Sequence, residues 1–240
     1  MTKSASASKL TAEDLERLVQ QALADAKAAG AEQAEVAASQ DLGLSATARL
    51  GDVEHLEYTN DRGLWVTVYR SSRKGSASTS DFAPSAIREA VDKACSFANF
   101  TAADEYAGLA DADLMCKEQR DLDLDHPWAL DAEQAIAMAI ECETAGLQSD
   151  ARISNSEGAT VATGRGTRAY GNSHGFLGSY SKTSHTVSCV LLAEQDGNMQ
   201  RDFHYTTARD AEDLDAVEIV GQMAARRTLA RLGAQKLSSR

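Results

Sequence analysis

Residues 171–175 of the sequence, Gly-Asn-Ser-His-Gly, match the G-x-S-x-G pattern that surrounds the nucleophilic serine of many hydrolases. Asp196, Asp202 and His204 follow Ser173 in the chain order that α/β-hydrolases use for a catalytic triad. Together these residue types could activate a serine hydroxyl for acyl transfer. The pattern requires a strand before the serine and a helix after it, because the sharp turn between them exposes the hydroxyl.

The residues that follow Ser173 predict a strand rather than that helix. Apolar positions alternate there with polar ones, as in Val187, Cys189 and Leu191. No helical pattern lies between Ser173 and His204, although a parallel hydrolase sheet needs crossover helices in such an interval. A serine-hydrolase site at Ser173 is therefore the weakest hypothesis, and a Ser173→Ala variant would test it.

A turn explains Ser173 more simply. Three segments share the form N-x-x-G and each precedes a β-like run: Asn60-Asp-Arg-Gly63, Asn155-Ser-Glu-Gly158 and Asn172-Ser-His-Gly175. Asn at the first position and Gly at the fourth favour a type I turn that leads into a bulge. We predict a turn at all three segments, with Ser173 as a turn residue.

Metal and nucleotide chemistry find little support in the sequence. Asp202 and His204 stand two apart on a predicted strand, hence on one face, but there is no H-E-x-x-H pair of helical ligands. The glycines at 164, 166 and 171 match neither G-x-G-x-x-G nor G-x-x-x-x-G-K-[ST]. We therefore expect this chain to bind no metal ion and no nucleotide.

The composition indicates a globular protein with an acidic surface. Of its 240 residues 43% are hydrophobic, and the net charge of -12 argues against nucleic acid as a partner. Residues 104–143 hold twelve acidic residues against Lys117 and Arg120. No C-x-x-C pair is present, and Cys142 and Cys189 lie in apolar stretches, which predicts buried, reduced thiols. Without an apolar run of membrane-spanning length or a secretory signal, we expect a cytoplasmic protein with no membrane partner.

Hydrophobic periodicity predicts four helices and two groups of short strands. The first helix opens with a capping box at Thr11–Asp14, and the second begins at Asp81–Pro84. A third helix begins at Asp131, and a last one begins at Asp210. Within each pair of helices, segments of period two are joined by short polar turns, which force antiparallel pairing.

These elements predict an α+β fold of two modules, each an antiparallel meander sheet flanked by helices. We place a disordered tail at residues 1–10 and an N-terminal α+β module at 11–103. An acidic connection at 104–130 then leads to a middle α+β module at 131–240.

Several stretches resemble the TldD/PmbA family. The run YTNDRGLWVTVYRSSRKGSASTSDFAPSAIREAVDKA is similar to the N-terminal module of these proteins, and the run from RISNSEG to QRDFHY is similar to their middle module. The stretches GNSHGF and QDGNMQRD are closer to the PmbA arm, also called TldE, than to the TldD arm. Family members are longer, so we expect the family's C-terminal domain to be absent from this chain.

The resemblance implies a subunit of a cytoplasmic heterodimeric zinc metalloprotease that acts on unfolded or extended peptides. In that family the zinc ligands belong to the TldD subunit, in an H-E-x-x-x-H motif, and zinc-bound water is the attacking group. The PmbA-like subunit lacks zinc ligands and completes the substrate chamber, so the implied partners are a TldD-like subunit and an extended peptide. The rival hypothesis is a non-enzymatic interaction module that regulates a partner, in line with the family's older description as a modulator of DNA gyrase.

A chamber that accepts peptides of any sequence can bind their main chain at a strand edge. We therefore expect the turns and strands from 155 to 175 to contact the peptide or the partner subunit. The candidate residues are Asn155, Ser156, Gly158, Arg165, Arg168, Asn172, Ser173 and Gly175. No catalytic residue is expected in this chain, and a plain structural hairpin is the alternative for these positions.

Overall fold

The computed structural model describes residues 9–116 and 120–235, so most of the tail predicted at residues 1–10 lies outside the described residues. The elements of the described part follow in this order: α1 (Ala12–Ala28), β1 (Gln33–Arg49), β2 (Asp52–Arg70), β3 (Arg73–Thr79), α2 (Pro84–Phe100), η1 (Ala112–Leu114), α3 (Ala132–Leu147), β4 (Ile153–Asn172), β5 (Leu177–Gln195), β6 (Asn198–Ala208), η2 (Ala211–Asp213) and α4 (Val217–Ala230). The two η elements are single 3₁₀ turns.

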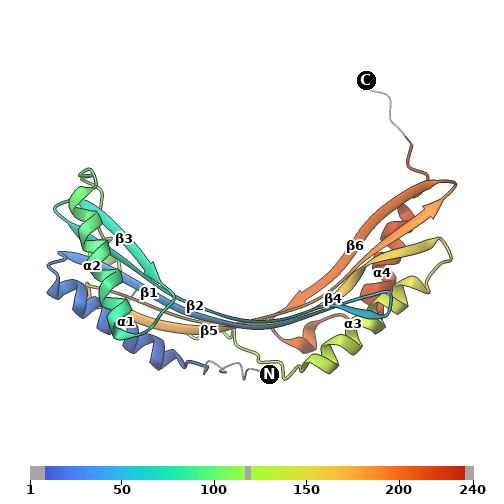
Figure 1. Cartoon of the computed structure of the whole chain (residues 1–240), viewed down its shortest axis with the longest axis horizontal. Coiled ribbons are helices and arrows are strands. Elements are labelled where there is room, and N and C mark those ends of the chain that lie inside the picture. Colours follow the sequence, from blue (N-terminus) through green and yellow to red (C-terminus); the bar gives the residue numbers. More distant parts are fainter. Residues whose placement is uncertain (1–8, 117–119, 236–240) are drawn as a thin grey trace. The chain divides into compact units, whose positions relative to one another are not determined.

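The strands form one six-stranded sheet in the order β3-β2-β1-β4-β5-β6. Each half of the chain contributes an antiparallel meander of three strands, and the meanders join through β1 and β4. Figure 1 shows α1 and α2 beside the strands of the first meander, and α3 and α4 beside those of the second. The predicted α+β fold of two meanders with flanking helices is thereby confirmed.

The chain divides into two compact units, each described here by itself. Unit 1 comprises Met1–Leu42, Asn60–Asp123 and Gly166–Lys182, and unit 2 comprises Gly43–Thr59, Leu124–Arg165 and Thr183–Arg240. The four long strands β1, β2, β4 and β5 therefore contribute residues to both units. The module boundaries inferred from sequence, at residues 103 and 131, stay a prediction.

In unit 1 two helices cover one face of the sheet. Leu15 and Val19 of α1 and Ile87 of α2 are buried in one apolar cluster with strand residues. The strand residues alternate along the chain: Ala34, Val36 and Ala38 in β1, and Leu64, Val66 and Val68 in β2. Because successive side chains of a strand point to opposite faces, the residues between them lie on the face away from these helices.

In unit 2 the helices α3 and α4 approach each other closely. A methyl group built on Gly221 would lie 2.0 Å from the backbone oxygen of Cys142, so only glycine permits this crossing. Cys142 and Cys189 are both buried in the core of the unit, which confirms the predicted burial. A hydrogen bond between the two thiols, followed by burial, raises the pKa of Cys189, which suits a side chain that only packs.

Three of the predicted helix starts are confirmed. The Thr11 side chain accepts a hydrogen bond from the Asp14 N–H, and the Asp14 carboxylate accepts one from the Thr11 N–H, forming a capping box. Asp131 and Gln134 form an equivalent box at α3. Pro84 occupies the first turn of α2, where its missing N–H costs nothing.

Three other predictions of local structure are wrong. Residues 60–63 lie inside β2 and residues 155–158 lie inside β4, so neither N-x-x-G segment is a turn between strands. Gly158 has a φ of +104°, which places a local irregularity in β4 where a reversal was expected. The last helix begins at Val217 and not at Asp210, because Ala211–Asp213 form a separate 3₁₀ turn.

Candidate functional site

The third N-x-x-G segment is a turn, as predicted, and it joins β4 to β5. The N–H of Gly175 donates to the carbonyl of Asn172 at 3.1 Å, and Gly175 has a φ of +91°. The Ser173 hydroxyl accepts from the N–H of Ala34 at 3.0 Å, and the Ser173 N–H donates to the Ala34 carbonyl at 2.8 Å. A strand follows instead of a helix, so the nucleophile-elbow hypothesis is wrong in its required geometry.

Four of the predicted contact residues belong to unit 2 and have structural partners there. The Asn155 side chain accepts from the Ser156 N–H at 2.8 Å, and the buried Ser156 hydroxyl accepts from the Gly158 N–H at 2.8 Å. Arg165 forms a two-point ion pair with Asp125, with the Nε to Oδ1 distance at 2.6 Å. Their contact with a peptide or partner stays a prediction.

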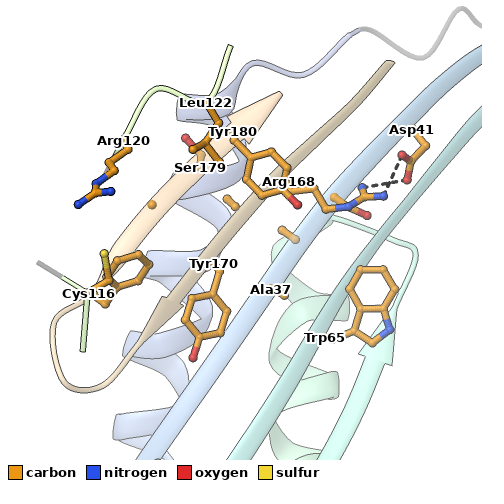
Figure 2. A pocket seen from close by; sticks show the side chains of 15 residues that line it. Ala37, Asp41, Trp65, Cys116, Arg120, Leu122, Arg168, Tyr170, Ser179 and Tyr180 are labelled. Atoms are coloured by element: carbon orange, nitrogen blue, oxygen red, sulfur yellow. Dashed lines mark hydrogen bonds and ion pairs between the residues drawn. The ribbon is translucent and has the colours of Figure 1, made fainter. Parts of the chain in front are cut away.

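Arg168 lines a pocket of about 860 Å³ that lies entirely within unit 1. Its walls come from β1, β2, β4, the start of β5 and the side chains of Cys116, Arg120 and Leu122 (Figure 2). Asp41, Trp65, Tyr170 and Tyr180 line it, all at positions that alternate with residues packed on α1 and α2. The pocket therefore occupies the sheet face that the two helices leave uncovered.

Large apolar side chains dominate the pocket wall. Trp65 is 51% exposed, Tyr180 46% and Leu122 63%. Gly63 precedes Trp65 on the same face of β2, and a methyl group there would lie 2.6 Å from the indole Cη2. Gly63 thus creates the space in which the Trp65 indole lies, which explains a glycine inside a strand.

The carboxylate of Glu35 fixes Tyr170 on the pocket wall. It accepts hydrogen bonds from the Tyr69 and Tyr170 hydroxyl groups, each at 2.9 Å. Burial, followed by this hydrogen bond, raises the pKa of Tyr69 to about 12. Burial also raises the pKa of Tyr170, whose ring packs on Phe176 at 5.9 Å between centroids.

Three charged residues line the pocket. Arg168 donates to both carboxylate oxygens of Asp41 at 3.0 Å, a bidentate pair that orients both side chains. Gly166 leaves room for this pair, since a methyl group there would lie 2.6 Å from Asp41 Oδ1. Arg120 lies at the other end of the pocket from Asp41 in Figure 2. Of the three lining charges, Asp41 and Arg168 thus pair with each other, and Arg120 is followed in the chain by Asp121.

The structure describes no metal centre. Within residues 9–116 and 120–235, no three His, Cys, Asp or Glu side chains are grouped so that they could hold a metal ion. Asp202, which the sequence pairs with His204, lies 3.5 Å from both Arg227 and Arg231. The described helices also include none long and apolar enough to cross a membrane.

Sequence reasoning found Arg168 but missed the aromatic residues around it. A signal exists in hindsight, because Trp65 and Tyr170 stand at alternate positions of strands whose other face is apolar. What the sequence lacks is the pairing of strands distant in the chain, which brings Asp41 to Arg168. The pocket therefore emerges only in three dimensions.

Two family models match the chain. Residues 34–98 match PmbA/TldA metallopeptidase domain 1, and residues 125–232 match the PmbA/TldA metallopeptidase central domain. The pocket draws on both stretches, since Trp65 belongs to the first and Tyr170 to the second, while Arg120 lies between them. Together the two matches cover well over half of the chain.

Curated relatives are similar along nearly the whole chain. Metalloprotease PmbA of Escherichia coli O157:H7 is 44% identical over 217 residues, which are 90% of this chain and 48% of the relative. The PmbA homolog of Haemophilus influenzae is 41% identical over 228 residues, covering 95% and 50%. The chain thus spans about half the length of the curated relatives it matches.

Solved structures share the fold. A proposed modulator of DNA gyrase from Bacteroides thetaiotaomicron superposes with a TM-score of 0.87 at 25% identity, over 95% of this chain and 52% of that one. TldE from Thermococcus kodakarensis superposes with a TM-score of 0.70 at 14% identity, over 88% and 47%. Matched by two models of one family and by curated PmbA relatives, the chain belongs to the PmbA/TldA metallopeptidase family.

Proposed function

We propose that the chain is a PmbA-like subunit of a heterodimeric zinc metalloprotease that acts on unfolded or extended peptides. The observation that carries this proposal is the 44% identity over 217 residues with metalloprotease PmbA. In this arrangement a TldD-like partner subunit holds the zinc ion, and the present chain completes the substrate chamber. Its cytoplasmic location belongs to the same proposal.

The part assigned to this chain is binding and orientation of the peptide. Among its described residues no three side chains are grouped so that they could hold a metal ion, and the proposal assigns the zinc ion to the partner subunit. The uncovered sheet face of unit 1 supplies an apolar pocket, and strands supply main-chain groups that can pair with an extended peptide. Holding a flexible peptide in one geometry lowers the entropic cost of a reaction at a neighbouring centre.

The test is peptidase activity reconstituted from two chains. Denatured, fluorescently labelled casein would be incubated with the chain, with a TldD-like subunit, and with both together. We expect cleavage only in the mixture, its loss on adding a chelator, and its recovery on adding Zn²⁺. Equal cleavage by the TldD-like subunit alone would contradict the proposal.

A non-enzymatic role remains the second candidate, because a solved protein of 25% identity is described as a modulator of DNA gyrase. This role predicts that the chain changes gyrase supercoiling activity without any change in peptide cleavage. The reconstitution separates the two candidates. Cleavage by the lone chain that Ser173→Ala abolishes would contradict both and restore the hydrolase hypothesis.

A further inference from the structure

We propose that the unit 1 pocket binds a peptide segment in which a bulky apolar side chain stands next to a carboxylate. The apolar side chain packs among Trp65, Tyr170 and Tyr180, and the carboxylate lies at Arg120. The choice of a peptide as ligand rests on the proposed function. The preference for an apolar side chain with an adjacent acid rests on the pocket itself.

The exposed apolar surface of the pocket favours binding of an apolar ligand group. Trp65, Tyr180 and Leu122 are each about half exposed or more, yet they gather on one wall. A soluble protein gains no stability from such a cluster, whereas a ligand that covers it removes the same apolar surface from water. The volume of about 860 Å³ holds a bulky side chain together with the neighbouring main chain.

Three side chains of the pocket wall are positioned by contacts within the protein. The Tyr170 hydroxyl is fixed on Glu35 at 2.9 Å, and Arg168 is held by two hydrogen bonds to Asp41. Gly63 provides the place for the Trp65 indole. Because these side chains already have their positions, binding orders few additional rotamers, and more of the contact energy appears as affinity.

The charge of the pocket favours an acidic group on the ligand. Asp41 forms an ion pair with Arg168. The Glu35 carboxylate accepts hydrogen bonds from two tyrosine hydroxyl groups. Of the lining charges this leaves Arg120, in a protein whose net charge is -12. A cation at the end of an apolar pocket attracts a carboxylate and fixes the direction in which the ligand lies.

Binding can be followed through Trp65 itself. The chain contains two tryptophans, so a Trp128→Phe background makes Trp65 the only indole reporter. The probe is a capped heptapeptide, acetyl-Gly-Ser-Gly-Phe-Asp-Gly-Ser-amide, titrated into the whole 240-residue chain. Two matched peptides carry Ala in place of Phe or Asn in place of Asp. Calorimetry on the unsubstituted chain checks the fluorescence result.

We expect saturable binding of the Phe-Asp peptide, about tenfold weaker binding of the Ala peptide, and weaker, less salt-sensitive binding of the Asn peptide. Tyr180→Ala and Arg120→Gln should each weaken binding of the Phe-Asp peptide about tenfold. The matched controls are Tyr58→Ala and Arg88→Gln, which replace exposed side chains outside the pocket and should leave the affinity unchanged.

Gly63→Ala provides an independent check, because it alters no residue that lines the pocket. The added methyl group displaces the indole, so the Trp65 emission should shift and the affinity should fall. Unchanged far-ultraviolet circular dichroism would show that each variant is folded.

Equal affinity for the three peptides, equal losses in the control variants, or no saturable binding would each overturn this inference. Partner-dependent cleavage of casein that persists in that case would leave the proposed function intact. Normal peptide binding without any cleavage by the reconstituted pair would overturn the proposed function and leave the pocket preference standing.

Discussion

The buried polar groups of unit 2 and the pocket residues of unit 1 differ in what they contact. In unit 2, Glu143 is 1% exposed and its carboxylate accepts from the N–H groups of Leu50 and Gly51 at 2.9 and 3.1 Å. His185 is fully buried, with its ring nitrogens 2.9 Å from the Thr163 hydroxyl and the His126 carbonyl. The hydrogen bonds of these two side chains are therefore made within the protein.

Unit 1 keeps comparable groups at a surface. Trp65 and Tyr180 are half exposed beside the Arg168–Asp41 pair, and their contacts leave space for another molecule. Residue type alone therefore gives a poor guide to function in this chain. His185 is held by hydrogen bonds inside unit 2, while Trp65, which the sequence analysis did not single out, borders the pocket of unit 1.

The largest effect is expected for Glu143→Ala in unit 2. The variant leaves the Leu50 and Gly51 N–H groups without an acceptor, at two residues with φ of +52° and +83° that form the turn between β1 and β2. We expect a loss of about 3 kcal/mol in the free energy of unfolding, measured by urea denaturation. Glu141→Ala is the matched control, because Glu141 lies two residues earlier in α3 and its side chain is exposed. Equal losses in both variants would remove the distinction between the units.

His185→Phe should have the next largest effect. Phenylalanine preserves the aromatic contact with Trp128, whose ring lies 5.4 Å away, but leaves the Thr163 hydroxyl and the His126 carbonyl without the imidazole. The expected loss in unfolding free energy is about 2 kcal/mol. A variant as stable as the parent would show that the buried imidazole is dispensable and available for another role.

Alkaline pH should reveal how much Tyr69 of unit 1, whose pKa is raised to about 12, contributes to stability. Tyr69 titrates at about 12 when folded and near its ordinary value of 10.0 when unfolded, so its contribution is complete below pH 10 and is lost between pH 10 and about 12. At pH 11 the loss is on the order of 1 kcal/mol. Tyr69→Phe should therefore lose less stability than the parent between pH 9 and pH 11.

The control for this titration is Tyr106→Phe, which removes an 86% exposed hydroxyl. Its stability should decline with pH as steeply as that of the parent. If Tyr69→Phe shows the same decline, the ionisation of the buried Tyr69 hydroxyl does not govern the alkaline limit of unit 1.

The smallest effect on stability is expected for Tyr180→Ala in the pocket. Because the side chain is already 46% exposed, its removal should change the unfolding free energy by less than about 1 kcal/mol, even where peptide binding is lost. Thermal unfolding of the variant beside Glu143→Ala measures the contrast directly. A loss as large as that of Glu143→Ala would mean that the pocket wall supports the fold.

Sequence reasoning succeeds where structure depends on near neighbours. The capping boxes at Thr11 and Asp131 are local hydrogen-bond patterns, and both are confirmed. The turn at residues 172–175 is also local, because its Asn and Gly positions satisfy the turn within four residues. The alternation of apolar residues was sufficient to predict the α+β class.

The same reasoning fails where a distant contact decides. Residues 60–63 have the form of a turn, but Gly63 serves a strand because the indole two residues later occupies the space. The acids after Asp210 resemble a helix start, yet they precede a 3₁₀ turn and the regular helix begins at Val217. For the site, Arg168 was found from its strand, while Trp65 and Tyr170 required knowledge of the strand order.

The pocket takes its wall from both matched stretches of the family, with Trp65 in one and Tyr170 in the other. Neither stretch alone supplies all the residues that line the pocket. Recombination between the genes of two relatives, at the junction near residues 99–124, would combine Trp65 of one protein with Arg168, Tyr170 and Tyr180 of the other. We therefore expect substitutions at Gly63 and at residues 168–180 to be correlated among natural sequences.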